Sequence, residues 1–275
     1  MKRRFHQVDV FSAVPLMGNP LAVVHAAQGI DDATMAAFAR WTNLSETTFL
    51  LPPTEPGADY CVRIWTPGGE LPFAGHPTLG SCWCWLAAGG QPRDDGVVVQ
   101  QCEVGQVRIR RSGQRLAFAA PPLRRSGPLD DALIAQITRA LGITRAEVVD
   151  HQWVDHGPGW CAVKLASGAA VRALQPDFPA LGELKLGVVG AQAADDDTAF
   201  EVRAFVGRGY EDPVTGSLNA SLAQWLIGSG RAPCAYVAAQ GHALQRAGRV
   251  HVQAEGDAIW VGGDVVACVE GEVNL

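Results

Sequence analysis

Short apolar segments rich in β-branched residues alternate along this chain with segments whose apolar residues recur at three- and four-residue spacing. The first pattern predicts strands at residues 7–12, 22–25, 60–65, 97–101 and 107–110. The second pattern predicts helices at residues 32–41, 76–88, 130–141 and 217–227. Because strands and helices are interspersed and strands are the more frequent, the pattern predicts a strand-rich mixed α+β fold.

One pattern occurs twice in the chain. Residues 62–65 read V-R-apolar-aromatic and are followed by E-x-P-x-x-G at 70–75 and a helix, and residues 202–205 and 211–216 repeat this order. A weaker echo pairs residues 18–24 with 157–163. Two echoes in the same order predict two similarly folded halves. We place the halves at residues 1–122 and 128–263, separated by a proline-rich stretch, and expect a tail from about residue 264 to 275 to return to the first half.

The repeat predicts a helix start after a glycine in each half. A helix N-terminus presents unpaired N–H groups and about half a positive charge, so a carboxylate or a developing oxyanion is its natural ligand. Gly75 and Gly216 would let the backbone approach that ligand closely, and the side chain of Thr215 or Ser217 is expected to cap the second helix. The predicted ligand is a small acid held between the two helix starts.

Chemistry is expected where the two copies of the repeat differ. Asp212 aligns with Leu71, and His76 aligns with Ser217, so one copy gains a carboxylate and the other an imidazole. Taken alone, His76 is compatible with a core or capping histidine, and Asp212 with an acid that stabilises a helix dipole. Glu46 lies in a polar turn between a predicted helix and a strand, where a glutamate is usually solvated.

Composition narrows the classes of partner. With 275 residues, 48% hydrophobic, the chain can bury a full core, and its net charge of -6 without clusters of Lys and Arg argues against nucleic acid. The chain has no run of eighteen or more apolar residues, so no membrane span is expected. Residues 1–10 look like a strand rather than a signal peptide. Seven scattered cysteines favour reduced thiols and a cytoplasmic protein, with Cys82 and Cys84 packing in a helix rather than binding metal.

These motifs together resemble a known family, the phenazine-biosynthesis isomerase-like (PhzF-like) proteins, which are relatives of diaminopimelate epimerase and proline racemase. The resemblance is carried by residues 8–11 with 18–20, 43–47, 73–77, 211–217, and 240–241 leading to Arg246. It spans nearly the whole chain. It implies two pseudo-symmetric domains of the diaminopimelate-epimerase type, each a curved, mostly antiparallel sheet around a central helix, with the active site between them.

The resemblance also implies an enzyme without cofactor or metal, often a homodimer, that acts on a small carboxylate-bearing molecule. In the family, the residue matching Glu46 shuttles a proton between two carbons, and the residues matching His76, Asp212 and Ser217 bind or polarise the substrate. We therefore expect Glu46, His76 and Asp212 to be catalytic. The expected substrate-binding residues are Asn19, Gly75, Gly216 and Ser217.

Proline racemases carry a cysteine immediately before each of two glycines, whereas this chain has Ala74 and Thr215 at those positions. A racemization with two bases needs one on each face of a carbon, while a single glutamate takes and returns a proton on its own face. The sequence therefore predicts a cofactor-independent isomerase that moves a proton on a small, cyclic amino acid. The alternatives are a non-catalytic small-acid-binding protein and an epimerase or racemase of another substrate. A nucleotide-dependent oxidoreductase is disfavoured because no G-x-G-x-x-G motif is present.

Overall fold

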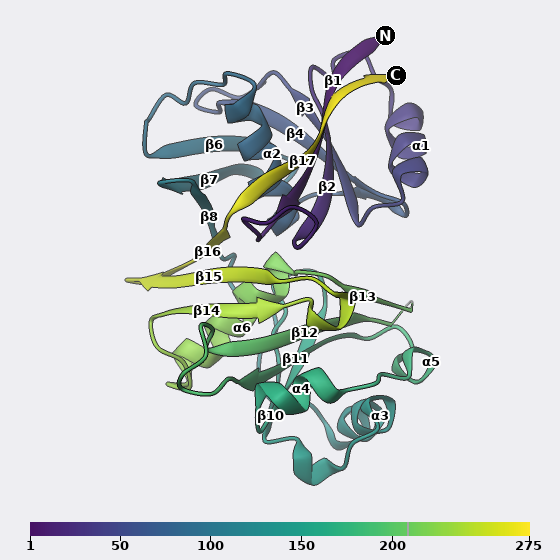
Figure 1. The fold of residues 1–275 in the computed structure, drawn as a ribbon, viewed down its shortest axis with the longest axis vertical. Helices are drawn as coiled ribbons and strands as arrows, with labels where there is room; N and C mark the ends of the chain where they lie inside the picture. The colour runs from purple at the N-terminus through teal and green to yellow at the C-terminus, as the bar shows by residue number, and fades with distance from the viewer. Residues whose placement is uncertain (208) are drawn as a thin grey trace. The chain divides into compact units, whose positions relative to one another are not determined.

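Strands interspersed with helices make up the structure, a computed structural model that describes residues 1–207 and 209–275 (Figure 1). The prediction of a mixed α+β fold is confirmed. The chain divides into two units, the first comprising Met1–Ala119 with Gly262–Leu275 and the second comprising Ala120–Val261. Within the part of the chain that the structure describes, no helix combines the length and the apolar character needed to cross a membrane.

The elements of the first unit are β1 (Lys2–Val10), β2 (Asn19–Val24), α1 (Asp32–Thr42), β3 (Glu46–Leu51), β4 (Tyr60–Thr66), β5 (Gly69–Leu71), α2 (Gly75–Ala87), β6 (Val97–Cys102), β7 (Gly105–Ser112), β8 (Arg115–Ala119) and β17 (Val265–Asn274). Those of the second unit begin with α3 (Asp131–Leu141), a 3-10 turn (Arg145–Glu147), β9 (Asp150–Trp153), β10 (Trp160–Leu165), α4 (Gly168–Ala173) and α5 (Phe178–Leu181). They continue with β11 (Lys185–Ala191), β12 (Phe200–Val206), β13 (Tyr210–Asp212), α6 (Gly216–Gly228), β14 (Ala235–Gln240), a 3-10 turn (His242–Leu244), β15 (Gly248–Glu255) and β16 (Ala258–Gly263).

The four predicted helices are present as α1, α2, α3 and α6, with ends within a residue or two of the prediction. The reading of residues 1–10 as a strand is confirmed by β1, which begins at Lys2, but the predicted end at residue 12 is wrong, because β1 ends at Val10. Phe11 takes a left-handed backbone conformation with φ of 66°, which an extended strand cannot accommodate. The short helices α4 and α5 were not predicted, since each has too few residues to show helical periodicity.

The same sequence of strand pairings occurs in both units. In the first unit, β1–β2 is antiparallel, β2–β3 parallel, β3–β4 and β4–β5 antiparallel, β4–β6 parallel and β6–β7 antiparallel. In the second unit, β9–β10 is antiparallel, β10–β11 parallel, β11–β12 and β12–β13 antiparallel, β12–β14 parallel and β14–β15 antiparallel. The repeat seen in the sequence therefore corresponds to a repeated strand topology.

The helix that follows each E-x-P-x-x-G motif is buried along most of its length. α2 contacts β1, β2, β3, β4, β6, β8 and β17, and its buried residues lie on every side of the helix. The buried residues of α6 also lie on every side of the helix. In contrast, α1 buries only one face, formed by Met35, Phe38 and Ala39. A helix that is apolar all round belongs in an interior. Gly80 of α2 makes this packing possible, because a Cβ there would lie 2.5 Å from Leu21 of β2.

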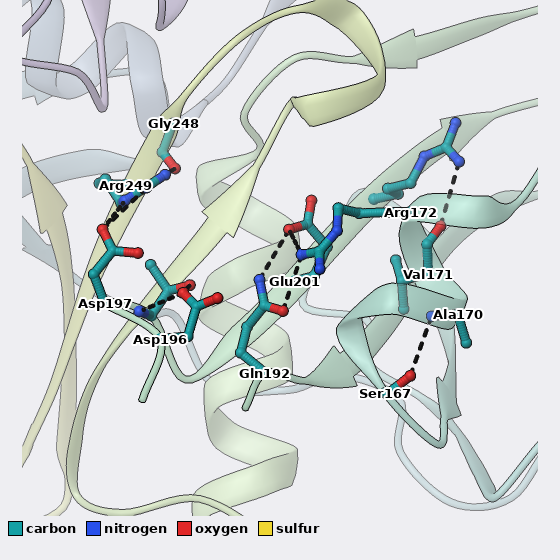
Figure 2. A network of polar contacts seen from close by, with 12 residues as sticks. Ser167, Ala170, Val171, Arg172, Gln192, Asp196, Asp197, Glu201, Gly248 and Arg249 are labelled. Atoms are coloured by element: carbon teal, nitrogen blue, oxygen red, sulfur yellow. Dashed lines mark hydrogen bonds and ion pairs between the residues drawn. The ribbon is translucent and has the colours of Figure 1, made fainter. Parts of the chain in front are cut away.

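In the second unit, a polar network joins α4 to the sheet (Figure 2). Arg172 of α4 donates to the Gln192 Oε1 atom at 2.9 Å and to the Glu201 Oε2 atom at 3.1 Å, and Gln192 Nε2 donates to the same Glu201 oxygen at 3.2 Å. Burial raises the pKa of Glu201, and the hydrogen bond from Arg172 opposes that shift. Because buried charges are stable only when paired, this network ties α4 to β12.

Candidate active site

Glu46 and His76 meet inside the first unit. Glu46 is the first residue of β3, where the parallel register sets it beside Leu21 of β2. His76 is the second residue of α2. Their Oε2 and Nε2 atoms lie 3.5 Å apart, and the side chains are only 16% and 6% exposed. From its position in the sequence alone, Glu46 would be expected to be a solvated turn residue. In the structure, its carboxylate is mostly enclosed and lies beside the His76 imidazole.

The imidazole of His76 is neutral at ordinary pH. Burial lowers its pKa from 6.5 to about 3, and a hydrogen bond with the Pro20 backbone acts in the opposite direction. The contact with Glu46 is therefore a polar contact between a carboxylate and a neutral ring, rather than an ion pair between two charges. A neutral imidazole can donate with one nitrogen and accept with the other, so it can orient a neighbouring carboxylate.

Asn19 belongs to the same part of the first unit. It is the fully buried first residue of β2 and directly precedes Pro20, the backbone partner of His76. Gly18, just before it, packs so closely that a Cβ there would lie 2.4 Å from the Val10 carbonyl oxygen. The first unit thus places three of the predicted site residues around the start of β2.

The start of α2 lacks a side-chain cap. Ala74 is its N-cap residue and Gly75 its first helical residue, and Ala74 has no side-chain oxygen to offer. α6 starts in the same way at Gly216, because the Thr215 side chain makes no capping hydrogen bond. The other α-helices of the described chain, α1, α3, α4 and α5, are all capped by an aspartate or serine oxygen. The two helix starts predicted to receive an anion are thus the two without a side-chain cap.

The prediction that Thr215 or Ser217 caps α6 with its side chain is wrong, because both hydroxyls have other partners. The Thr215 Oγ1 atom donates to Asp212 Oδ2 at 2.6 Å and accepts from Gln240 Nε2 at 2.9 Å. The Ser217 Oγ atom accepts from Trp160 Nε1 at 3.1 Å. The hydroxyl of Thr215 is therefore used to hold the carboxylate of Asp212.

Asp212 is the last residue of β13 and is half-buried. It lies opposite Ala204 in the β12–β13 ladder, as Leu71 lies opposite Ile64 in the β4–β5 ladder. The strand register therefore agrees with the sequence alignment in which Asp212 replaces Leu71. Asp212 and Leu71 therefore occupy equivalent positions in the two units, and only the second unit has a carboxylate there.

Gln240 belongs to one of the motifs that carry the family resemblance, but the sequence alone indicates no role for it. Its Oε1 atom accepts from the Thr215 N–H at 3.0 Å and from Asn219 Nδ2 at 2.8 Å, while its Nε2 atom donates to the Asp212 carbonyl at 3.1 Å. Asn219 was missed altogether. The available signal was its position four residues after Thr215, on the same face of the helix. Gln240 and Asn219 fix the turn that carries Asp212.

The predicted site residues thus form two local groups, Asn19, Gly75, His76 and Glu46 in the first unit and Asp212, Gly216 and Ser217 in the second. Neither group contains three closely spaced metal-ligating side chains. Among the described residues, the candidate cluster of that kind is formed by His6, His25 and Cys84.

Residues 8–271 match the model of a protein family described as PhzC-PhzF, phenazine biosynthesis-like protein. An uncharacterized isomerase of Pasteurella multocida is 33% identical over 98% of this chain and 93% of its own length. A trans-2,3-dihydro-3-hydroxyanthranilate isomerase of Pseudomonas aeruginosa is 31% identical over 99% of both chains.

Solved structures show the same fold. A predicted epimerase from Pseudomonas aeruginosa is 27% identical and superimposes with a TM-score of 0.81, with 99% of each chain covered. A hydroxyproline epimerase from Agrobacterium vitis has a TM-score of 0.58 at 14% identity, with 99% of this chain and 92% of the other covered. The second likeness shows that this fold is shared with a hydroxyproline epimerase.

Proposed function

The chain belongs to the phenazine biosynthesis-like (PhzC-PhzF) family of isomerases, and we propose that it moves a proton between two carbons of a small carboxylate-bearing, cyclic amino acid. The observation that carries this proposal is the enclosed contact of 3.5 Å between Glu46 and His76. General acid–base catalysis needs a side chain positioned within reach of the proton that it transfers, and an enclosed carboxylate beside a polar partner suits that role.

In the proposed reaction, the Glu46 carboxylate removes a proton from one carbon of the substrate. The electrons of the broken C–H bond form a new double bond, the existing double bond shifts, and the protonated Glu46 returns the proton to a second carbon on the same face. His76 acts as a neutral hydrogen-bonding group beside Glu46, which is the state that its low pKa favours. The step balances without a cofactor, because one proton leaves and one is returned.

A racemase mechanism with two thiols has no support in this chain. Ala74 and Thr215 occupy the N-cap positions of α2 and α6, where proline racemases carry cysteines. The Thr215 hydroxyl is also committed to Asp212 and Gln240. A single carboxylate base therefore favours a proton shift over an inversion at one carbon.

We propose further that the groups of the second unit bind the polar ends of the substrate. The start of α6 at Gly216 and Ser217, like that of α2 at Gly75, carries first-turn N–H groups without a side-chain cap, which suits a carboxylate or a developing negative charge. Asp212 would pair with the substrate ammonium group, and Gln240 and Thr215 hold it in place. Asn19 would help to orient the substrate beside Glu46.

The test is proton NMR of trans-2,3-dihydro-3-hydroxyanthranilate with the protein in D2O, run in parallel with Glu46→Gln and with Glu103→Gln as a control at an exposed glutamate. We expect new product resonances with the wild type and the control. With Glu46→Gln, the rate should fall by at least about 100-fold, the low end for general acid–base catalysis.

Full activity of Glu46→Gln would contradict the proposed mechanism. If the wild type is inactive on this compound, the same assay is extended to other small cyclic amino acids. Ligand-induced thermal stabilisation without turnover across that panel would contradict catalysis and favour the small-acid-binding alternative.

A further inference from the structure

Three buried side chains with metal-ligating atoms meet in the first unit, away from the residues discussed above. They are His6 of β1, His25 directly after β2, and Cys84 of α2. One ligand atom of each, two imidazole nitrogens and a thiol sulfur, lies within 4.8 Å of the other two. The sequence assigns Cys84 to helix packing, and no local pattern joins it to His6 and His25, which lie more than fifty residues earlier in the chain.

The fold brings the three residues together through two independent contacts. His25 continues the β1–β2 ladder, where its N–H donates to the Arg4 carbonyl at 2.9 Å, so it lies near His6 on the neighbouring strand. The Nδ1 atom of His6 is 2.8 Å from the Nε2 atom of His25. Cys84 reaches them from α2, which packs against both strands.

This cluster lies at the opposite ends of its elements from Glu46 and His76. Cys84 follows His76 by eight residues, which is about 12 Å along a helix at 1.5 Å per residue. His25 follows Asn19 by six residues, which is roughly 20 Å along a strand at 3.3 Å per residue. A ligand held here would not touch the proposed proton-transfer residues.

We propose that His6, His25 and Cys84 bind a single transition-metal ion of the zinc class. Two imidazoles and a thiolate form a donor set that suits zinc, and three protein ligands leave a fourth tetrahedral position for water or another small ligand. His25 also lines a cavity of about 230 Å³, bordered by Tyr60 and Trp85.

The outer contacts of His6 act on its tautomer in opposite directions. Its second ring nitrogen, Nε2, lies 3.8 Å from the Glu270 Oε2 atom and 3.4 Å from Arg4 Nη2. Because a guanidinium can only donate, the Arg4 contact favours the tautomer with its proton on Nδ1, whereas Glu270 favours a proton on Nε2, the tautomer that leaves Nδ1 available for a metal. Nδ1 is also the atom that faces His25, so metal binding would require the ring proton to sit on Nε2, beside Glu270.

The competing explanation is a buried pair of histidines joined by a hydrogen bond and packed against a cysteine. The two interpretations differ in geometry, because nitrogens that share a zinc ion at about 2.0–2.1 Å must lie roughly 3.3–3.4 Å apart. The present separation of 2.8 Å would have to increase by roughly half an ångström. They also differ chemically, since binding converts the Cys84 thiol to a thiolate and releases its proton.

The experiment uses the full chain stripped with a chelator and then titrated with Zn²⁺ or Co²⁺. We expect one Zn²⁺ per chain by elemental analysis, and an intense near-ultraviolet absorption band with Co²⁺ that reports a cobalt–thiolate bond. Cys84→Ala should abolish that band and weaken Zn²⁺ binding at least about tenfold. Cys82→Ala is the matched control, because Cys82 is equally buried in the same helix and should leave both readouts unchanged.

Absence of the cobalt–thiolate band in the wild type would overturn the proposal without requiring any variant to fold. Zn²⁺ binding that survives unchanged in a folded Cys84→Ala variant would also overturn it. Neither readout involves turnover, so the result does not depend on the proposed isomerase activity.

Discussion

Arg203 binds Glu211 through two parallel hydrogen bonds, from Nε to Oε1 at 2.9 Å and from Nη2 to Oε2 at 2.7 Å. The two side chains are only 4% and 6% exposed. Arg63 and Glu70 form the same bidentate pair in the first unit, with both bonds at 2.6 Å, but these side chains are 28% and 29% exposed. The glutamate of each E-x-P-x-x-G motif therefore fixes the turn before the helix in its own unit.

The difference in burial predicts unequal effects of removing the two glutamates. Glu211→Ala leaves a buried guanidinium without its carboxylate and should reduce the free energy of unfolding by about 3–5 kcal/mol. Glu70→Ala should cost no more than about 1 kcal/mol, because that pair is partly solvated and Arg63 also binds Asp32 at 2.6 Å. Denaturant unfolding of both variants compares the two losses. Equal losses would show that burial does not decide the strength of the pair.

Asp212→Asn should weaken substrate binding more than it slows the chemical step. The amide oxygen can still accept the hydrogen bond from Thr215, so the turn is retained, but the charge proposed to pair with an ammonium group is lost. A hydrogen bond to a charged group is worth about 1.5–3 kcal/mol, which corresponds to a rise in KM of roughly 10- to 100-fold. Steady-state kinetics on the substrate that the wild type turns over measure this rise.

The exposed Asp257→Asn is the matched control for Asp212→Asn and should leave KM unchanged. If Asp212→Asn instead lowered kcat at constant KM, Asp212 would act in the chemical step and the assignment to the ammonium group would be wrong.

Much of the fold could be predicted from local patterns. The helices α1, α2, α3 and α6 each carry enough turns for apolar periodicity to show, and the repeated motif predicted a repeated topology that the strand pairings display. Short elements such as α5, with four residues, escaped prediction because one turn contains too little pattern. The apolar pattern extended the first strand to residue 12, because it does not register the left-handed backbone of Phe11 that ends β1 at Val10.

The sequence shows less of the candidate site than of the fold, for reasons of tertiary structure. Asp212 and His76 stood out because they break the repeat, which is a local signal. The enclosure of Glu46 depends on α2 folding over the start of β3, and no local pattern reports such a contact. Gln240 acts through hydrogen bonds that span 21 and 25 residues, which no local pattern reports, whereas Asn219 lies one helical turn after Thr215 and its spacing alone did not single it out.

His76 should make the protein sensitive to acid. Its pKa is about 3 in the folded state and 6.5 when unperturbed, so the unfolded chain binds the extra proton between these values. This contribution to stability is fully present above pH 6.5 and is lost progressively as the pH falls toward 3. In His76→Gln, the free energy of unfolding should fall less between pH 7 and pH 4 than in the wild type. Denaturant unfolding at a series of pH values measures the two slopes, with the exposed His242→Gln as control.

An unchanged slope in His76→Gln would mean that the ring is not held neutral in the folded protein. Burial also lowers the pKa of His25 to about 4, so part of the acid sensitivity is expected to remain in the variant.

A new side-chain cap on α2 should increase stability at the expense of substrate binding. Ala74 has the extended backbone of an N-cap residue, with φ of -150° and ψ of 142°, and in Ala74→Ser the hydroxyl oxygen can accept the first-turn N–H of His76. We expect a gain of about 1 kcal/mol in the free energy of unfolding and a rise in KM, because the hydroxyl competes with the substrate carboxylate. Asp31→Ala provides the converse control: it removes the cap of α1, where Asp31 accepts the Thr34 N–H at 2.8 Å, and should lower stability without changing KM. An Ala74→Ser variant that gains stability and keeps its KM would show that the start of α2 does not bind the substrate.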